Sequence, residues 1–419
     1  MNQYKNYFYM LGLLLGLNAC NKVNLQPSPT PTPPTGTTTT NQVIEGNTQF
    51  ALDIYQEVVN ENENQMLSPY SISTALAMVY AGTDGNTATE MQNVLGFGPN
   101  NNSFHQAFNR VTNTIESNIN TAPNNEINII NKIWRNTSFN FLSSFEQLMN
   151  NEYLAPVVAT DFSQKAASRQ LINNWVDQET HQLIPELLPN GFITDKTVSV
   201  LVNAIYFKAD WEQQFVPAFT HPQSFRTTNA VVTTDMMSDL IPTNDLKFTE
   251  DADAEVLELF FKDKQSSIVL ILPKNAAVGI NNFVQQTLSK TKVDQWFADL
   301  AHPAPNSNFS VQIPKWDFDS DFDLVAPLKT LGVREAFSDQ ANLSKMAEGA
   351  LFIEKIKHKA VITAHEGGVE AAAATAVGIG VTSAPPVART FQANRPFVFM
   401  IKDTETNSIL FIGHVQDPS

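Results

Sequence analysis

The chain has 419 residues, 26 basic and 42 acidic side chains and one cysteine, so its net charge is −16. This acidic balance argues against nucleic acid as a partner, because phosphate binding needs clustered Lys and Arg, and a hydrophobic content of 42% argues against global disorder. A single cysteine excludes an intrachain disulfide framework and any paired-cysteine zinc or redox site.

The N-terminal residues have the pattern of an export signal. Lys5 provides a positive charge before an almost wholly apolar run at 7–17, which is shorter than the roughly twenty residues of a transmembrane helix. The only cysteine follows this run in the order Leu-Asn-Ala-Cys. Residues 1–19 therefore resemble the signal peptide of a bacterial lipoprotein, which is removed before a lipid-modified cysteine, here Cys20. The alternative is a plain secretory peptide with an incidental cysteine.

Residues 20–45 have the composition of a tether. Five prolines between 27 and 34 alternate with Ser and Thr, and a run of Thr follows at 37–40. Such a segment stays extended and builds no core. We therefore expect an exported protein anchored through Cys20 to a bacterial membrane, at the outer membrane or cell surface, with one folded domain over 46–419. One acyl chain anchors weakly, so stable attachment needs several.

The folded part begins with helical patterns and continues mainly with strand patterns. Ser68 is expected to cap a helix that has Pro69 at its first position. Apolar periodicity predicts helices over 50–58, 69–80, 87–94 and 166–183. It predicts strands over 126–134, 198–207, 256–261, 267–272, 311–318, 351–363, 396–401 and 408–413. The continuous apolar run at 198–207 is typical of a strand buried on both faces. This mixture predicts an α+β fold with large antiparallel sheets.

A segment without a single charge, residues 371–388, lies between two predicted strands. A loop of this length in a compact domain is usually functional or disordered. Its apolar bulk falls on one parity, which is the period of a half-buried strand. That parity is Val369, Ala371, Ala373, Thr375, Val377, Ile379 and Val381. The alternative is a flexible or helical Ala-rich loop.

Several motifs, in order along the chain from about Asn47 to the C-terminus, resemble the serpin family. The segments 67–72, 203–208 with Trp211, and 358–360 resemble its core motifs, and residues 391–413 resemble its C-terminal signature. One further segment resembles the hinge of inhibitory serpins, and it consists of Glu366, Gly367, Gly368, Val369, Glu370, Ala371, Ala372, Ala373, Ala374 and Thr375. The resemblance implies the serpin fold, with three β-sheets, about nine helices and an exposed reactive-centre loop at 366–390.

The resemblance also implies a mechanism and a set of supporting residues. A serine or cysteine endopeptidase attacks the loop, forms a covalent acyl-enzyme and is trapped when the cleaved loop inserts into the main sheet. Such a protein is expected to be a monomer without cofactor, metal or catalytic residues. Ser68, Ser71, Asn203 and His358 correspond to the polar shutter beneath the sheet. Lys315 and Glu366 correspond to an ion pair at its top, the breach, beside Trp211.

The family's usual spacing from Glu366 places the reactive bond between Thr382 and Ser383, with Val381–Thr382 as second choice. A Thr or Val before the cut suits the shallow apolar pockets of elastase-like or subtilisin-like proteases. Trypsin-like targets are disfavoured because the nearest basic residue, Arg389, lies too far along and is expected to flank the next strand. Val369 departs from the pattern, since Thr or Ser is commoner there in inhibitors.

Enzymatic functions find little support in the motifs. His365-Glu366 lacks the second histidine of HExxH, and no G-x-S-x-G elbow occurs. The serious alternative is a non-inhibitory serpin-like binding or surface protein. A purely structural surface lipoprotein explains nothing about residues 366–383.

Overall fold

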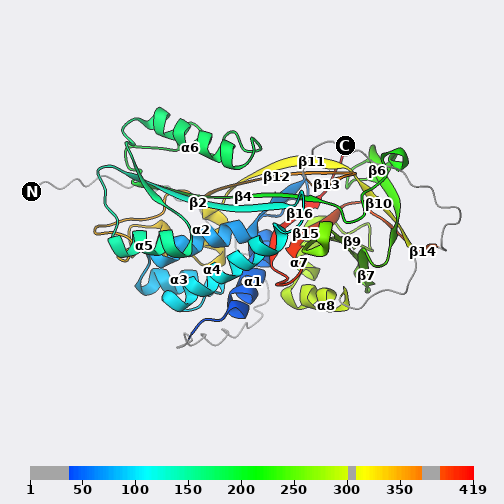
Figure 1. Cartoon of the computed structure of the whole chain (residues 1–419), viewed down its shortest axis with the longest axis horizontal. Helices are drawn as coiled ribbons and strands as arrows, with labels where there is room; N and C mark the ends of the chain where they lie inside the picture. Colours follow the sequence, from blue (N-terminus) through cyan, green and yellow to red (C-terminus); the bar gives the residue numbers. More distant parts are fainter. Residues whose placement is uncertain (1–36, 301–307, 370–386) are drawn as a thin grey trace, which may run out of the picture. The chain divides into compact units, whose positions relative to one another are not determined.

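The computed structural model describes residues 37–300, 308–369 and 387–419, all within one compact unit. These residues contain nine α-helices and three β-sheets, which confirms the predicted α+β class (Figure 1). The helices are α1 (Thr40–Val58), α2 (Pro69–Ala81), α3 (Gly85–Leu95), α4 (Asn102–Ile119), α5 (Ser143–Glu152), α6 (Lys165–Glu179), α7 (Ile280–Thr287), α8 (Lys290–Leu300) and α9 (Val325–Leu331).

The three sheets differ in strand order. The main sheet runs β11 (Trp316–Asp323), β12 (Lys357–His365), β13 (Gly368–Val369), β4 (Ser199–Asp210), β2 (Glu126–Asn136) and β3 (Val157–Thr160). The second sheet runs β1 (Gln65–Leu67), β16 (Ile409–Val415), β15 (Phe397–Asp403), β9 (Ser266–Pro273), β8 (Ala254–Phe260) and β7 (Leu246–Glu250). The third sheet runs β14 (Val387–Gln392), β10 (Asn308–Pro314), β6 (Val231–Pro242) and β5 (His221–Arg226).

The main sheet has helices on both faces (Figure 1). On one face, α6 packs Ile172 and Val176 against Trp134, Val200 and Val202 in a small core of their own. On the other face, α1, α2 and the second sheet share the large core with the opposite parity of β2 and β4. Alternate residues of each strand therefore belong to different cores, as the pleat of a strand requires.

Two helix starts follow from local sequence. The side chain of Ser68 accepts a hydrogen bond from the Ser71 N–H at 3.2 Å, and Pro69 occupies the first helical position of α2, as predicted. α1 begins at Thr40, inside the segment expected to be tether, because Thr39 and Gln42 form a capping box there. In the described part of the chain, no helix combines the length and apolar character needed to cross a membrane.

Four predicted elements differ in extent or burial. The strand expected at 311–318 is two strands in different sheets, because the chain leaves β10 at Pro314, which has no N–H to continue a ladder. The helix expected at 166–183 ends at Glu179, since His181 and Gln182 adopt positive φ angles. Only the part from Lys357 of the strand expected at 351–363 forms, as β12.

The fourth difference concerns β4. The sequence predicts a strand buried on both faces, but every other residue of β4 from Ser199 to Ile205 is only half-buried. Leu201 and Ile205 belong to the row that faces the large core. They stay accessible because the described residues fill the neighbouring strand position only beside the C-terminal end of β4, where β13 pairs with Ala209 and Asp210. We call this end the top of the sheet.

Candidate functional site

The first residues of the predicted hinge, Gly368 and Val369, form β13 in the middle of the main sheet. In β13, Gly368 lies opposite Asp210 of β4 and His365 of β12, and Val369 lies opposite Ala209 and Ala364. Val369 is 3% exposed and belongs to the large core. Val369 is the first residue of the apolar row predicted for this segment, and its side chain points into the large core.

Gly368 is required at its position by close approach. A Cβ atom there would lie 2.1 Å from the carbonyl oxygen of Ala209 and 2.8 Å from the Cα of Asp210. Real Cβ atoms do not approach backbone atoms so closely, and backbone cannot move aside as a flexible side chain can. The glycine lets the hinge chain enter between two strands.

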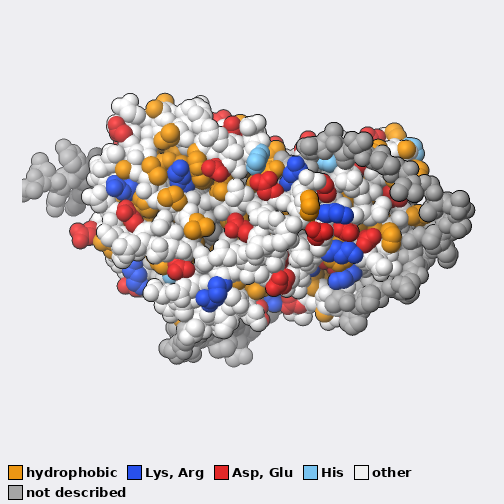
Figure 2. Space-filling view, in the orientation of Figure 1, with side chains coloured by type: hydrophobic (Ala, Val, Ile, Leu, Met, Phe, Trp, Pro, Cys, Tyr) orange, Lys and Arg blue, Asp and Glu red, His pale blue; other side chains and the backbone are white. Residues whose placement is uncertain are grey.

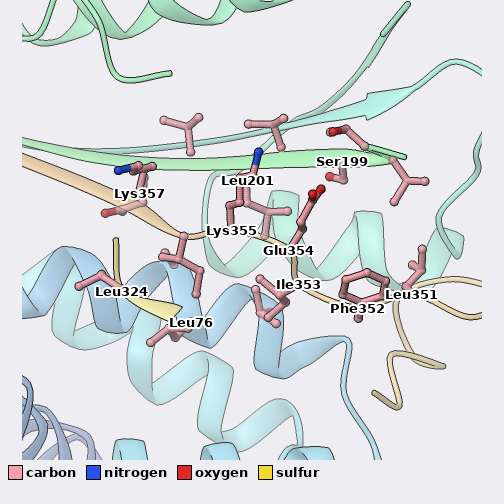
Figure 3. Close-up of a pocket in the computed structure, with 18 of the residues that line it drawn as sticks. Leu76, Ser199, Leu201, Leu324, Leu351, Phe352, Ile353, Glu354, Lys355 and Lys357 are labelled. Carbon is pink, nitrogen blue, oxygen red and sulfur yellow. The ribbon is translucent and has the colours of Figure 1, made fainter. Parts of the chain in front are cut away.

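Beyond Val369, β4 and β12 form no ladder with each other, which leaves a slot between them in the described structure. A small cavity lies next to Val369, between Phe207, Val361 and Phe411. A larger cavity of about 230 Å³ lies beside the N-terminal end of β4, which starts at Ser199 and which we call the lower end (Figure 3). Its walls are mainly apolar and include Leu76, Leu201, Leu324, Leu351 and Ile353.

Trp211 lies where β4 meets β13, beside the turn that precedes the hinge. Its Nε1–H donates to the carbonyl of His365 at 2.8 Å, and its backbone N–H donates to the carbonyl of Gly367 at 2.9 Å. The indole is 2% exposed and stacks on Phe261, with ring centroids 4.9 Å apart. Trp211 therefore ties the turn before the hinge to the end of β4.

Lys315 and Glu366 form the expected ion pair at the breach, with 3.3 Å between Nζ and Oε2. Burial by itself would raise the pKa of Glu366, but hydrogen bonds and the ammonium group of Lys315 outweigh it and lower the pKa. The Lys315 side chain is 40% exposed, so solvent screens the pair and its contribution to stability is small.

The shutter residues meet beneath the main sheet. The backbone N–H of Ser68 donates to His358 Nε2 at 2.9 Å, and the Ser68 hydroxyl donates to the carbonyl of Leu410 at 2.7 Å. The Ser71 hydroxyl donates to the side-chain oxygen of Asn203. The start of α2 is thereby bonded to both strands that border the slot, β4 and β12.

His358 is neutral at physiological pH. Burial lowers its pKa to about 4, because an imidazolium there would lose its hydration. The neutral ring uses the lone pair of Nε2 to accept the Ser68 N–H, and it stacks with Phe322 at 6.4 Å. A protonated Nε2 could not accept this hydrogen bond, so the contact with Ser68 requires the neutral ring.

The polar network extends further than the sequence analysis recognised. Asn203 Nδ2 donates to Asn131 Oδ1 at 2.6 Å, and Asn131 Nδ2 donates to the Tyr153 carbonyl at 3.0 Å. The Tyr153 hydroxyl lies 2.6 Å from Nδ1 of His105. The sequence did contain a sign of this network. Asn131 interrupts the core-facing isoleucines of β2, and Asn203 interrupts the apolar row of β4 that faces the same core.

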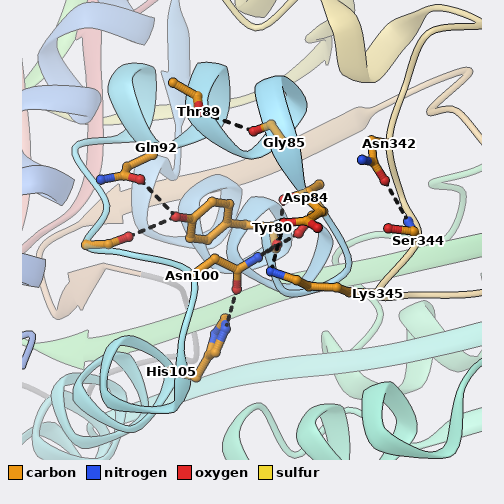
Figure 4. A network of polar contacts seen from close by, with 12 residues as sticks. Tyr80, Asp84, Gly85, Thr89, Gln92, Asn100, His105, Asn342, Ser344 and Lys345 are labelled. Atoms are coloured by element: carbon orange, nitrogen blue, oxygen red, sulfur yellow. Dashed lines mark hydrogen bonds and ion pairs between the residues drawn. The ribbon is translucent and has the colours of Figure 1, made fainter. Parts of the chain in front are cut away.

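The network ends at Asn100, which lies between His105 and Tyr80 (Figure 4). The side-chain oxygen of Asn100 is 3.0 Å from His105 Nε2, and its amide nitrogen donates to the Tyr80 carbonyl at 2.6 Å. Polar groups therefore connect the slot with the helical layer of α2 and α4.

The remaining predicted residues lie outside the described part of the chain. They are Cys20, the hinge residues Glu370, Ala371, Ala372, Ala373, Ala374 and Thr375, and the reactive-bond residues Val381, Thr382 and Ser383. Among the residues that are described, no group of three His, Cys, Asp or Glu side chains is arranged to hold a metal ion.

Comparison with known proteins identifies the family. Residues 45–418 match the family model described as Serpin (serine protease inhibitor). The chain is 33% identical to the leukocyte elastase inhibitor of Sus scrofa, over 90% of this chain and all of that protein. It is also 33% identical to an uncharacterized serpin-like protein of Methanosarcina acetivorans, over 89% of this chain and 85% of that protein.

Solved structures agree in fold. The native state of the thermophilic serpin tengpin is 27% identical, with a TM-score of 0.76, over 92% of this chain and 97% of that one. Serpin48 of the insect Tenebrio molitor is 30% identical, also with a TM-score of 0.76, over 90% and 98%. With its hinge between β4 and β12, its shutter beneath them and a family match over nearly the whole described chain, this protein belongs to the serpin family.

Proposed function

We propose that this serpin is a suicide inhibitor of serine endopeptidases that traps the acyl-enzyme by inserting its cleaved loop into the main sheet. The observation that carries the proposal is the position of β13. Gly368 and Val369 pair with β4 on one side and with β12 on the other. Insertion then only has to extend a strand that has already begun, between two strands that do not pair with each other in the described part of the chain.

The register of β13 assigns partners to the rest of the hinge. Its continuation would place Ala371 between Phe207 and Ile362, Ala373 between Ile205 and Ala360, and Thr375 between Asn203 and His358. Small side chains would enter the upper slot, and a hydroxyl would arrive at the polar shutter. The row that would be buried, Val369, Ala371, Ala373 and Thr375, carries no charge to desolvate.

Energetics favour this insertion. The facing edges of β4 and β12 have backbone groups that a new strand would pair. At about 1 kcal/mol net per hydrogen bond, a dozen bonds contribute on the order of 10 kcal/mol. Burial of the half-exposed Leu201 and Ile205 adds to this. The total is comparable to the stability of a whole domain, which is enough to drive the change.

The targets proposed are elastase-like or subtilisin-like enzymes, with cysteine endopeptidases as a second class. Thr382–Ser383 is the proposed reactive bond and Val381–Thr382 the alternative. Neither offers a basic side chain to a trypsin-like pocket. The similarity to leukocyte elastase inhibitors of several mammals supports an elastase-like target.

The test is incubation of residues 21–419 with elastase-like, subtilisin-like, trypsin-like and papain-like proteases. We expect a complex with the elastase-like or subtilisin-like enzyme that survives denaturant, and mass spectrometry should locate the cut after Thr382 or Val381. Cleavage by every protease without any covalent complex would contradict inhibition and favour a non-inhibitory binding protein.

A hinge variant tests the insertion step. Ala373→Pro removes a backbone donor at a position that would lie inside the new strand, so the variant should be cleaved without trapping the protease. Ala373→Ser is the matched control, because it keeps the N–H and a small side chain and should still form the complex. Equal trapping by both variants, measured as inhibitor molecules consumed per protease, would refute insertion through this register.

We also propose that Cys20 carries the lipid anchor, with residues 1–19 removed and the part of 20–45 that precedes α1 acting as the tether. Metabolic labelling with an alkyne fatty acid in a bacterial host should label the full chain and leave Cys20→Ser unlabelled. The wild-type protein should fractionate with membranes and the variant should not. A wild type without label and without membrane attachment would point to a plain secretory signal, and membrane attachment of Cys20→Ser would point to another anchor.

A further inference from the structure

The larger cavity of the slot has the size and lining of a binding site. Its volume of about 230 Å³ exceeds the roughly 150 Å³ of an apolar protein cavity that stays dry and binds benzene. Leu76, Leu201 and Leu324 line it from three different elements (Figure 3). Phe352, half of which is exposed, stands at its edge. An apolar chain would be enclosed here.

A cation without a carboxylate partner lies at the same cavity. Lys355 donates from Nζ to the carbonyl of Phe192 at 3.3 Å and lies 5.1 Å from the centre of that ring. No described carboxylate lies within ion-pair distance of it, whereas Lys357 next to it is paired with Asp321 at 3.5 Å. An ammonium group has three donors, so Lys355 keeps two for another acceptor.

The other charges near the cavity leave this cation dominant. Lys196, Glu354 and Lys357 also line it. Water screens Lys196 and Glu354, which are exposed, and Asp321 pairs with Lys357. Lys355 is half-buried and held in place by Phe192. An amphiphile with an apolar tail and a single negative head therefore fits better than a cationic or uncharged one.

We propose that the cavity between the lower ends of β4 and β12 binds a medium-chain fatty carboxylate, with the alkyl tail among Leu76, Leu201 and Ile353 and the carboxylate on Lys355. The alkyl chain replaces the apolar contacts that the open slot lacks. The carboxylate accepts the free N–H groups of Lys355.

Occupancy has a consequence that rests on the proposed function. The register of β13, extended downward, brings residue 377 between Leu201 and Ile356, and both residues line this cavity. A bound alkyl chain and an inserted loop would exclude each other. The ligand should therefore increase the number of inhibitor molecules that are cleaved for each protease trapped.

Binding is tested first, on the full chain and without any protease, by calorimetry with octanoate. We expect one molecule per chain and an affinity that rises about fourfold for each CH₂ added between hexanoate and octanoate. Octan-1-ol and octylamine should bind about tenfold more weakly than octanoate, because they lose the charged hydrogen bonds. Equal binding of octan-1-ol would overturn the carboxylate assignment, and non-saturable binding would overturn the site.

Two variants locate the ligand. Lys355→Gln should weaken octanoate about tenfold and leave octan-1-ol unchanged. Ile353→Trp fills the cavity from its loop side and should abolish binding of both. Lys329→Gln is the matched control, because Lys329 also lies over a ring, that of Phe337 at 5.7 Å, but does not line the cavity. Unchanged octanoate binding in Ile353→Trp, folded as judged by circular dichroism, would place the ligand elsewhere.

The coupling to inhibition is measured separately. Saturating octanoate should at least double the inhibitor molecules consumed per elastase-like protease in the wild type and have no effect on Ile353→Trp. Specific binding together with an unchanged consumption would refute the mutual exclusion and leave the site standing. Absence of any protease complex would refute the proposed function, while the calorimetric result would still decide the site.

Discussion

At the scale of single residues, Gly368 is the point where the hinge passes closest to β4. A side chain there would collide with the backbone of Ala209. We expect Gly368→Ala to push β13 out of the sheet and lower the free energy of unfolding by about 1–3 kcal/mol. Urea unfolding measures this loss, and hydrogen exchange at Trp211, whose N–H bonds to Gly367, should show the local opening.

Val369→Ala is the control for this prediction. It removes apolar bulk from the same strand but keeps its backbone pairing with Ala209 and Ala364. Its amides at the breach should stay protected. If Gly368→Ala is as stable and as protected as the wild type, the close approach is not a constraint on the hinge.

Three buried histidines predict how stability depends on pH. Burial lowers the pKa of His105, His358 and His414 to about 4, with the charge of Lys345 adding to the effect at His105. Unfolding returns each to an ordinary pKa of about 6.5, so the unfolded chain binds more protons as the pH falls. Stability is therefore complete above about pH 6.5 and declines toward pH 4, by about 2 kcal/mol per histidine near pH 5.

Urea unfolding at several pH values between about 7.5 and 5 checks this dependence. His358→Gln should flatten the decline by the share of one histidine, whatever its effect at neutral pH. His221→Gln, at an exposed position in β5, should keep the full decline. A stability that stays constant or rises over this interval would contradict the neutral, buried state of these rings.

At the scale of elements, the start of α2 is the joint between the helical layer and the slot. Ser68 caps α2 and also donates to Leu410 of β16, and its own N–H reaches His358 of β12. Ser68→Ala removes the cap and leaves buried polar groups without partners. We expect a loss of about 1–3 kcal/mol in the free energy of unfolding, measured by urea titration.

Thr39→Ala provides the comparison. Thr39 caps α1 with the same chemistry, but its hydrogen bonds with Gln42 are exposed to water. Its loss should therefore cost at most about 1 kcal/mol. Equal costs for the two variants would mean that Ser68 acts only as a helix cap and does not bind the layers together.

At the scale of the whole molecule, the main sheet has a strand position that the described residues fill only with Gly368 and Val369. Cleavage of the loop should fill it and raise the melting temperature by on the order of 10 °C, given about 10 kcal/mol of new hydrogen bonds. Scanning calorimetry before and after limited proteolysis measures the rise. Cleaved Ala373→Pro should show little of it, and a wild type that melts at the same temperature after cleavage would contradict insertion.

Charge is spread over the molecule in pairs on the face seen in Figure 2, where positive and negative side chains lie next to each other. Around α8 and β7, Glu250 pairs with Lys274 and Arg389, and Lys292 pairs with Asp251 and Asp253. Arg389 was expected to flank the next strand, but it lies within β14, opposite Phe309, and belongs to this charged group. Its charge is therefore partly neutralised by Glu250.

Local patterns were sufficient for part of the elements and for the parity of the hinge, whereas helices such as α4 and α8 were not predicted. The cap at Ser68 predicted the start of α2, and β8 and β9 pair as their apolar runs indicated. The parity that placed Val369 on the apolar side agrees with its burial. These features depend on neighbours in sequence, through helix capping and the twofold alternation of strands, so the chain alone determines them.

Only the tertiary structure decided which strands border the slot and what connects them. Ser68 bonds Leu410 and His358, partners that are 342 and 290 residues away, and Asn131 meets Asn203 across 72 residues. The half-buried face of β4 likewise depends on the neighbouring strand position, which β13 fills, among the described residues, only opposite Ala209 and Asp210. Side-chain periodicity tells which face of a strand is apolar, but the space beside the strand is set by distant segments.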